Sequence, residues 1–174
     1  ESEAGDIIQD LDFELGNTVA KKFADRNGEE EELSLNHIYR EGVNKGGKWK
    51  GALLFFTTGW CPPCKAEAEI LADLAYQYEE EGILFIGIVL EDTNYAQATG
   101  EYAQEHSNEY GWTFPTVAGR VSALSEYWPA GGIAFPMNML LDLDTMEIKT
   151  VQTGALMNGS ALSEFVSPVI SGGE

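Results

Sequence analysis

Two long apolar segments separated by an amphipathic one form the clearest pattern in this chain. Residues 52–57 and 83–90 are almost wholly apolar, which predicts strands that are covered on both faces. The stretch between them repeats apolar residues at helical spacing, with Leu71 and Tyr78 on one stripe and acidic residues on the other. A strand, a helix and a strand in this order predict a parallel pair joined by a right-handed crossover.

The pattern on either side predicts further elements. They are a hairpin with arms at 11–15 and 19–23, a short helix capped by Ser34, a helix capped by Thr93 or Asn94, a short helix over 122–128, strands over 137–141 and 148–153, and a closing helix over 160–170. Tyr95, Tyr102 and His106 fall at helical spacing and are expected in the core. The Phe114-Pro115 loop is expected to lack a core strand directly after it.

This order of elements predicts the fold class. A β-α-β unit followed by β-β-α, with a helical insert between them, predicts an α/β protein whose mixed central sheet carries helices on both faces. The length of 174 residues suits one domain. We expect that domain over residues 11–170, with 1–10 as a polar N-terminal tether and 171–174 as a C-terminal tail.

The strongly acidic charge limits the partners. Asp and Glu number 29 against 10 Lys and Arg, which gives a formal net charge of −19. Nucleic acid is not an expected partner, because phosphate contacts require clustered Lys and Arg. The simpler interpretation of the acidity is a soluble, self-repelling surface, and the alternative is attraction to a basic protein.

No apolar run of the sequence approaches the roughly 20 residues of a membrane-spanning helix. The chain begins at Glu1 and not at Met, so we expect either that a signal peptide or lipid anchor was removed or that the chain was trimmed. Two cysteines at redox spacing fit an oxidising or a reducing compartment.

The only two cysteines stand as Cys61-Pro62-Pro63-Cys64, directly after the first apolar run and at the start of the predicted helix. Residues at i and i+3 can close a disulfide there with little movement of the backbone. Backbone N–H groups and the helix dipole also favour a thiolate at this position. Pro62 suits the first helical position, and Pro63 removes a second donor. The N–H of Cys64 is therefore the nearest local donor to the sulfur of Cys61.

This cysteine pair predicts redox chemistry. We expect Cys61, at the exposed end, to be the attacking thiolate, and Cys64, one turn inside, to be the resolving thiol. A static disulfide and a metal site are the alternatives. Zinc requires four ligands, whereas the sequence offers only His37 and His106, on separate segments. We assign no metal ligands and expect no cofactor beyond the redox-active disulfide.

Glu67 continues the apolar stripe of the helix and not its wet side, because it lies three residues before Ile70 and four before Leu71. A carboxylate in that position is partly desolvated beneath the cysteine pair, which raises its pKa and suits it to proton transfer. The alternative is an acid in the first turn that only complements the helix dipole.

Two segments could supply a surface for a substrate. Trp60 could form part of an apolar docking surface or merely pack over the helix start. A cis peptide before Pro136 would bring the Phe135 backbone close to the sulfurs, where its N–H and C=O could pair with an extended substrate segment. The candidate substrate-binding residues are Trp60, Pro62, Pro63, Phe135 and Pro136.

The run Trp60-Cys61-Pro62-Pro63-Cys64-Lys65, then Glu67, and Phe135-Pro136 before an apolar strand that ends in Asp142 resemble the thioredoxin superfamily. Within it, the chain is similar to the TlpA/ResA-like thiol–disulfide oxidoreductases of the extracytoplasmic space, which border on the AhpC/TSA group. The resemblance covers residues 11–170 and implies a thioredoxin-like three-layer fold.

Each candidate residue has a counterpart in that family. The resemblance implies that Cys61 is the nucleophile and Cys64 the resolving cysteine, that Glu67 matches the glutamate after the second cysteine, and that Pro136 matches the cis-proline. Cytosolic thioredoxins carry a buried Asp where this chain has Phe55, which leaves Glu67 as the local base.

The resemblance also implies a function. We expect exchange with protein disulfides or dithiols by a monomer that is periplasmic or anchored as a lipoprotein, with a redox partner protein that restores the dithiol. A thiol peroxidase is the alternative enzyme, since Thr58 lies three residues before Cys61, although Leu54 replaces the proline expected seven before. A copper-handling binding module is the third interpretation, without a well-placed histidine or methionine ligand.

Overall fold

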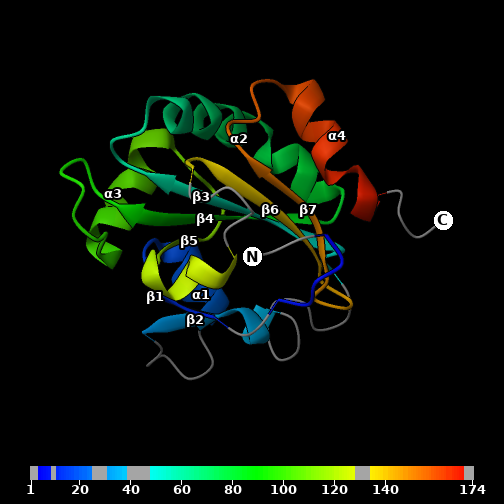
Figure 1. Ribbon diagram of the computed structural model, residues 1–174, viewed down its shortest axis with the longest axis horizontal. Helices are drawn as coiled ribbons and strands as arrows, with labels where there is room; N and C mark the ends of the chain where they lie inside the picture. The colour runs from blue at the N-terminus through cyan, green and yellow to red at the C-terminus, as the bar shows by residue number, and fades with distance from the viewer. Residues whose placement is uncertain (1–3, 9–10, 25–30, 39–47, 128–133, 171–174) are drawn as a thin grey trace.

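A seven-stranded mixed sheet with the order β2-β1-β5-β4-β3-β6-β7 runs through the protein, as the computed structural model shows for residues 4–8, 11–24, 31–38, 48–127 and 134–170 (Figure 1). The strands are β1 (Asp12–Leu15), β2 (Glu32–Ser34), β3 (Gly51–Thr58), β4 (Ile83–Glu91), β5 (Thr116–Ala118), β6 (Met137–Asp142) and β7 (Ile148–Thr153). Strands β3, β4 and β5 are parallel, and the outer strands are antiparallel to their neighbours. The predicted mixed α/β sheet is confirmed.

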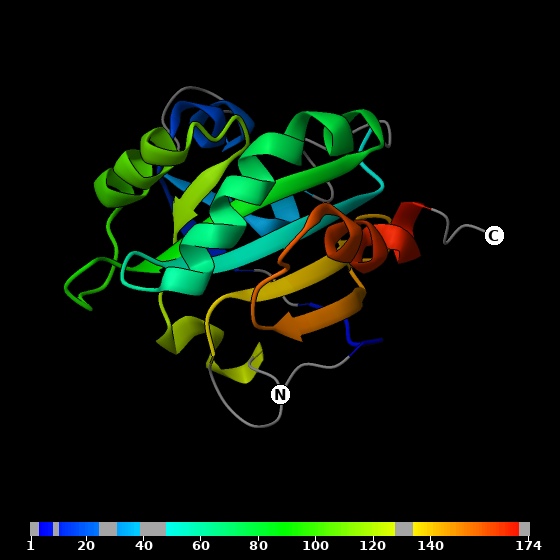
Figure 2. The same ribbon diagram turned by 90° about the horizontal axis from the view of Figure 1, so that it is seen from above.

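Helices cover both faces of this sheet, as the two ribbon views show (Figures 1 and 2). Helices α2 (Pro62–Glu80), α3 (Gly100–Tyr110) and α4 (Gly159–Ile170) lie over one face. Helix α1 (Thr18–Ala24) and the short 3₁₀ helix η2 (Ser122–Tyr127) lie over the other. The three layers predicted from the sequence are therefore present.

The alternation of side chains along the central strands divides the core into two halves. In β3, Leu54 and Phe56 enter the half beneath α1, whereas Leu53 and Phe55 enter the half beneath α2 and α4. All eight residues of β3 are buried, because both faces of the strand are covered. The carboxyl end of this strand leads directly into the cysteine segment.

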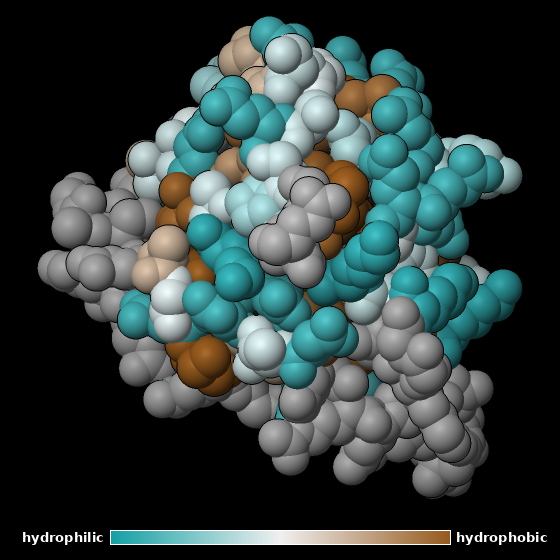
Figure 3. Space-filling view, turned by 90° about the vertical axis from the view of Figure 1, so that its right-hand side faces the viewer, coloured by the Kyte–Doolittle hydropathy of each residue, from teal (hydrophilic) through white to brown (hydrophobic). Residues whose placement is uncertain are grey.

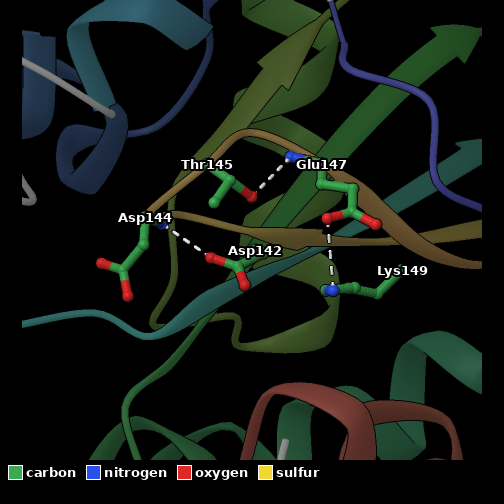
Figure 4. Close-up of polar contacts among 5 residues, drawn as sticks. All are labelled: Asp142, Asp144, Thr145, Glu147 and Lys149. Carbon is green, nitrogen blue, oxygen red and sulfur yellow. Dashed lines mark hydrogen bonds and ion pairs between the residues drawn. The ribbon is translucent and has the colours of Figure 1, made fainter. Parts of the chain in front are cut away.

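The turn between β6 and β7 is held by short-range hydrogen bonds (Figure 4). The carboxylate of Asp142 accepts the N–H of Asp144 at 2.8 Å, and the hydroxyl oxygen of Thr145 accepts the N–H of Glu147 at 3.1 Å. Lys149 pairs with Glu147 at 3.3 Å. The predicted antiparallel return of the chain at Asp142–Thr145 is confirmed, since polar turn residues close their own backbone there.

The N-terminal segment lies against this same turn. The N–H of Gly5 donates to the carbonyl of Ile148 at 2.7 Å, and the N–H of Ile8 donates to the carbonyl of Met146 at 3.0 Å. Ile8 is buried in the core. Residues 5–8 are therefore part of the folded domain, whereas the sequence predicted a polar tether over 1–10.

The second arm of the predicted N-terminal hairpin is a helix. Residues 19–23 lie in α1, and β1 pairs instead with β2 and β5. The side chain of Asn17 explains the difference: its Oδ1 accepts the N–H of Ala20 at 2.9 Å and so caps α1. Its amide nitrogen donates to Ser107 Oγ and to the Phe114 carbonyl, each at 2.9 Å. These partners are distant in sequence and could not be read from the local pattern.

Two further predictions about the middle of the chain are wrong. Helix α3 begins after Thr99, whose hydroxyl caps the N–H of Tyr102 at 3.1 Å, and not after Thr93 or Asn94. Strand β5 follows Phe114-Pro115 directly, where no strand was expected. It has only three residues, which is too short to give a periodic pattern.

Several smaller predictions are confirmed or fall outside the described residues. The hydroxyl of Ser34 accepts the N–H of His37 at 2.9 Å, as expected of a helix cap. The 3₁₀ helix η2 and helix α4 lie where short and closing helices were predicted. The tail at 171–174 lies outside the described part of the chain.

The molecular surface is mostly polar where it can be seen. On the face shown in Figure 3, hydrophilic residues predominate and hydrophobic residues form small separate patches. No helix among the described residues is long and apolar enough to cross a membrane.

His106 packs as an aromatic ring in the core beneath α3. It is 4% exposed, with ring centroids 5.0 Å from Tyr110 and 5.2 Å from Trp112. Neither ring nitrogen has a hydrogen-bond partner. Burial, together with the positive charge of Lys65, lowers the pKa of His106 from 6.5 to about 4. The imidazole is therefore neutral at physiological pH.

This lowered pKa predicts a loss of stability in mild acid. Between pH 6.5 and pH 4 the unfolded chain holds a proton on His106 that the folded chain excludes, so the free energy of unfolding falls as the pH falls. From pH 7 to pH 5 the loss from this residue is about 2 kcal/mol. Urea unfolding should show that His106→Phe loses about that much less than the wild type over the same interval. An equal pH dependence in both proteins would contradict the assignment.

Candidate active site

The two cysteines form a disulfide at the junction between β3 and α2. Their Cα atoms are 5.2 Å apart. Cys61 is the N-cap of α2 in an extended conformation, and Pro62 and Pro63 fill the first helical positions. The N–H of Cys64 donates to the Cys61 sulfur at 3.3 Å, as the sequence predicted. The helix start therefore directs a backbone donor at the sulfur that we expect to be the nucleophile.

Both sulfurs are more buried than the sequence suggested. Cys61 is 2% exposed and Cys64 is 1% exposed. The expectation that Cys61 occupies an exposed end is therefore wrong. Trp60 and Phe135 pack against the apolar cluster that contains both cysteines. Pro62 and Pro63, by contrast, are exposed.

The Phe135-Pro136 peptide bond is cis, as the resemblance implied. It brings the Phe135 carbonyl oxygen to 3.6 Å from the Cys61 sulfur. On the far side, the Pro136 carbonyl accepts the N–H of Gly154 at 2.8 Å, which ties this turn to the loop after β7. The structure thus places the Phe135 carbonyl beside the disulfide, where the sequence predicted a substrate contact.

Trp60 is held by three neighbours. Its indole N–H donates to Glu91 Oε1 at 2.9 Å. The ring stacks on Tyr95 with centroids 4.9 Å apart, and it meets Phe135 edge-on at 6.1 Å. Tyr95 was expected in the core, but it is 65% exposed, because the loop before α3 turns it outward onto Trp60.

Glu67 points into the protein, as predicted, and is 0% exposed. Its Oε1 accepts the amide N–H of Asn138 at 2.9 Å and the backbone N–H of Leu156 at 2.8 Å. Burial raises the pKa of this carboxyl from 4.5 to about 7, and the two hydrogen bonds only partly oppose the effect. A group that titrates near neutral pH can accept or return a proton under physiological conditions.

Asn138 is a site residue that sequence reasoning missed. It lies on β6 opposite Phe55 of β3 and is fully buried. The one available signal was an amide in the otherwise apolar run 137–141. Its Oδ1 and the Oε2 of Glu67 are both buried without a hydrogen-bond partner. When the carboxyl is charged, one side-chain oxygen of Glu67 and one of Asn138 therefore lack a hydrogen bond.

A second layer of aromatic residues supports α2 from the side of α3. The indole N–H of Trp112 donates to the Ala68 carbonyl at 3.0 Å. Phe55 meets Trp112 edge-on, with ring centroids 6.0 Å apart. Tyr102 lies so close to Gly59 that a side chain at position 59 would collide with its hydroxyl.

In the described ranges there is no cluster of three or more His, Cys, Asp or Glu side chains that could hold a metal ion.

The fold and the disulfide at the helix start define a thioredoxin-like protein, which agrees with the comparison to known families. The AhpC/TSA family profile matches residues 16–146, about three quarters of the chain. The chain belongs to the AhpC/TSA family. The predicted membership of the thioredoxin superfamily, on its TlpA/ResA-like side, is confirmed.

Individual relatives agree with this placement. The thiol-disulfide oxidoreductase ResA of Oceanobacillus iheyensis is 35% identical over 66 residues, which cover 38% of this chain and 31% of the relative. The match thus spans about a third of that protein. A putative thiol:disulfide interchange protein DsbE from Chlorobium tepidum superposes with a TM-score of 0.65 at 14% identity, covering 98% of this chain and 99% of that one. StoA from Bacillus subtilis superposes with a TM-score of 0.57 at 22% sequence identity, covering 89% of this chain and 96% of that one.

The raised pKa of Glu67 predicts a stability that falls as the pH rises. The folded protein keeps a proton on Glu67 between pH 4.5 and pH 7 that the unfolded chain has lost, so this contribution is full below pH 4.5 and disappears above pH 7. From pH 5 to pH 8 the oxidised wild type should lose about 2.5 kcal/mol more than Glu67→Gln.

Urea unfolding at the two pH values measures this difference. Glu69→Gln is the matched control, since Glu69 is exposed on the same helix, and it should behave like the wild type. If Glu67→Gln and Glu69→Gln had the same pH dependence, Glu67 would not hold a proton at neutral pH.

Proposed function

We propose that this chain is a thiol–disulfide oxidoreductase that acts on protein disulfides and dithiols through Cys61 and Cys64. The observation that carries the proposal is the disulfide at the start of α2, with the Phe135 carbonyl beside one sulfur. The buried carboxyl of Glu67, one turn further along the helix, supports it. The family membership and the name of the ResA relative support it independently.

In the reduced form, the Cys61 thiolate attacks one sulfur of a substrate disulfide. The substrate S–S bond breaks, a mixed disulfide forms, and the other substrate sulfur leaves as a thiolate that takes up a proton. The backbone donor of Cys64 and the positive end of the α2 dipole stabilise the attacking thiolate. Because Cys61 is only 2% exposed, the groups that cover it must move before a substrate sulfur can reach it.

Cys64 completes the exchange. Its thiolate attacks the Cys61 sulfur of the mixed disulfide, which forms the Cys61–Cys64 bond and releases the second substrate thiol. Two electrons have then passed from the protein to the substrate. Cys64 must lose its proton first, and Glu67, with a pKa of about 7, accepts it near neutral pH.

We further propose that the protein works outside the cytoplasm as a reductant and that a redox partner protein restores its dithiol. The resemblance to the TlpA/ResA-like group supports a periplasmic or lipoprotein-anchored location. A protein of the same fold from Corynebacterium glutamicum is named a secreted thiol-disulfide isomerase. The direction depends on the reduction potential of the pair, which spans about 150 mV among thioredoxin-like proteins.

Cysteine variants test the two assigned roles. Cys61→Ala should abolish the reduction of insulin, because no nucleophile is left to open the substrate disulfide. Cys64→Ala should accumulate a mixed disulfide with the substrate, visible by non-reducing electrophoresis and mass spectrometry. Equal partial activity in both variants would contradict the roles. The reduction potential, measured against glutathione, then decides the direction.

A thiol peroxidase is the second candidate, and the AhpC/TSA match favours keeping it. Thr58, three residues before Cys61, is buried with a hydroxyl that has no hydrogen-bond partner. Turnover of hydrogen peroxide by the reduced protein, with dithiothreitol as the electron source, separates the two functions. Peroxide turnover that exceeds insulin reduction would favour the peroxidase function. A lack of peroxide turnover would exclude the peroxidase function.

A further inference from the structure

The loop between β4 and α3 holds Tyr95 in a backbone conformation that large residues rarely adopt. Its φ is 65°, in the left-handed region. Asp92 enforces this shape, since its Oδ1 accepts the N–H of Asn94 at 2.8 Å and of Ala96 at 3.1 Å. The backbone N–H of Asp92 donates a hydrogen bond to the Ala96 carbonyl at 2.8 Å, which closes the loop. Strain that is held in place by several bonds points to a use for the side chain.

The ring of Tyr95 lies near the cysteine pair, one aromatic contact away from the chain neighbour of Cys61. One face stacks on Trp60, the neighbour of Cys61 in the chain. The residue is nevertheless 65% exposed, so the opposite face of its ring is open to solvent. Trp60 in turn meets Phe135, whose carbonyl lies beside the Cys61 sulfur. Tyr95 thus extends the aromatic surface around the disulfide outward.

Acidic groups flank this aromatic surface. Glu91 binds the indole N–H of Trp60 through Oε1, and Asp92 lies at the base of the loop that carries Tyr95. Both side chains are partly exposed, and the whole chain has a formal net charge of −19. An exposed aromatic face beside carboxylates binds a lysine or arginine side chain better than an apolar or acidic one.

We propose that Tyr95, together with Glu91 and Asp92, forms a specificity site for a basic residue next to the reacting cysteine of the substrate protein. The inference rests on the proposed function, because it needs Cys61 to exchange with a protein disulfide. The partner it defines is an extended, cationic, cysteine-bearing segment. The cation lies on the open face of the Tyr95 ring while the substrate cysteine reaches Cys61.

Two short peptide disulfides that differ only in a Lys or a Glu beside the cysteine test this site. The measured quantity is the ratio of the second-order rate constants of the reduced protein with the Lys and the Glu peptide. Tyr95→Ala should lower this ratio by roughly two- to fivefold, the range of an exposed cation–π contact. Tyr95→Phe keeps the ring and should keep the ratio. Because the ratio compares two substrates of one protein, it cancels any general effect on the sulfur chemistry.

Tyr76→Ala is the matched control, because Tyr76 is also strongly exposed, at 71%, but lies on α2 away from Trp60. It should leave the ratio unchanged, and Glu91→Gln should lower it. The preference should also weaken as the salt concentration rises. A ratio in Tyr95→Ala equal to that of the wild type, or an equal fall in Tyr76→Ala, would overturn the proposal.

Oxidised glutathione separates this proposal from the proposed function. If the reduced wild type fails to exchange with glutathione and with both peptides, the oxidoreductase assignment itself fails. If it exchanges with all three and Tyr95 does not affect the peptide ratio, only the specificity site is wrong.

Discussion

The cap that the Cys61 sulfur places on helix α2 is the interaction on which the site depends. Two prolines fill the first helical positions and have no N–H to offer, so the donor of Cys64 turns to that sulfur. One local contact therefore fixes where the helix begins and where both sulfurs lie. The helix continues from that point at 3.6 residues per turn. Its starting position therefore also determines that Glu67, one turn after Cys64, is buried.

The burial of Glu67 is costly, and the protein relieves the cost only in part. One oxygen has two donors, from Asn138 and Leu156, whereas the other has none. Full solvation or complete pairing would return the acid to its usual pKa and leave it permanently charged at neutral pH. Incomplete pairing in a dry site holds the pKa near 7. An unfavourable arrangement for stability is thus a useful one for moving protons.

The sequence was most informative where chemistry or periodicity is local. The strands on both sides of the cysteine helix have unbroken apolar runs, and the cysteine spacing and the inward position of Glu67 follow from helical geometry. Predictions failed where a partner is distant or a signal is degenerate. Asn17 caps α1 while its amide bonds to residues 90 and 97 positions away, and α3 is capped by Thr99 although the sequence also has cap-forming residues at Thr93 and Asn94, where the helix was expected to begin. Asn138 and Tyr95 were missed or misplaced for the same reason, since their partners come from other segments.

The short stretch 154–156 contacts both the cis turn beside the disulfide and the buried acid of the site. Its first residue, Gly154, holds the Pro136 carbonyl on the outer side, and its last, Leu156, holds the Glu67 carboxyl on the inner side. These two bonds are only two residues apart on one piece of backbone. One end of that piece borders the cis turn beside Cys61, and the other end borders the buried carboxyl. The same three residues of backbone therefore anchor both the cis turn and the titrating acid.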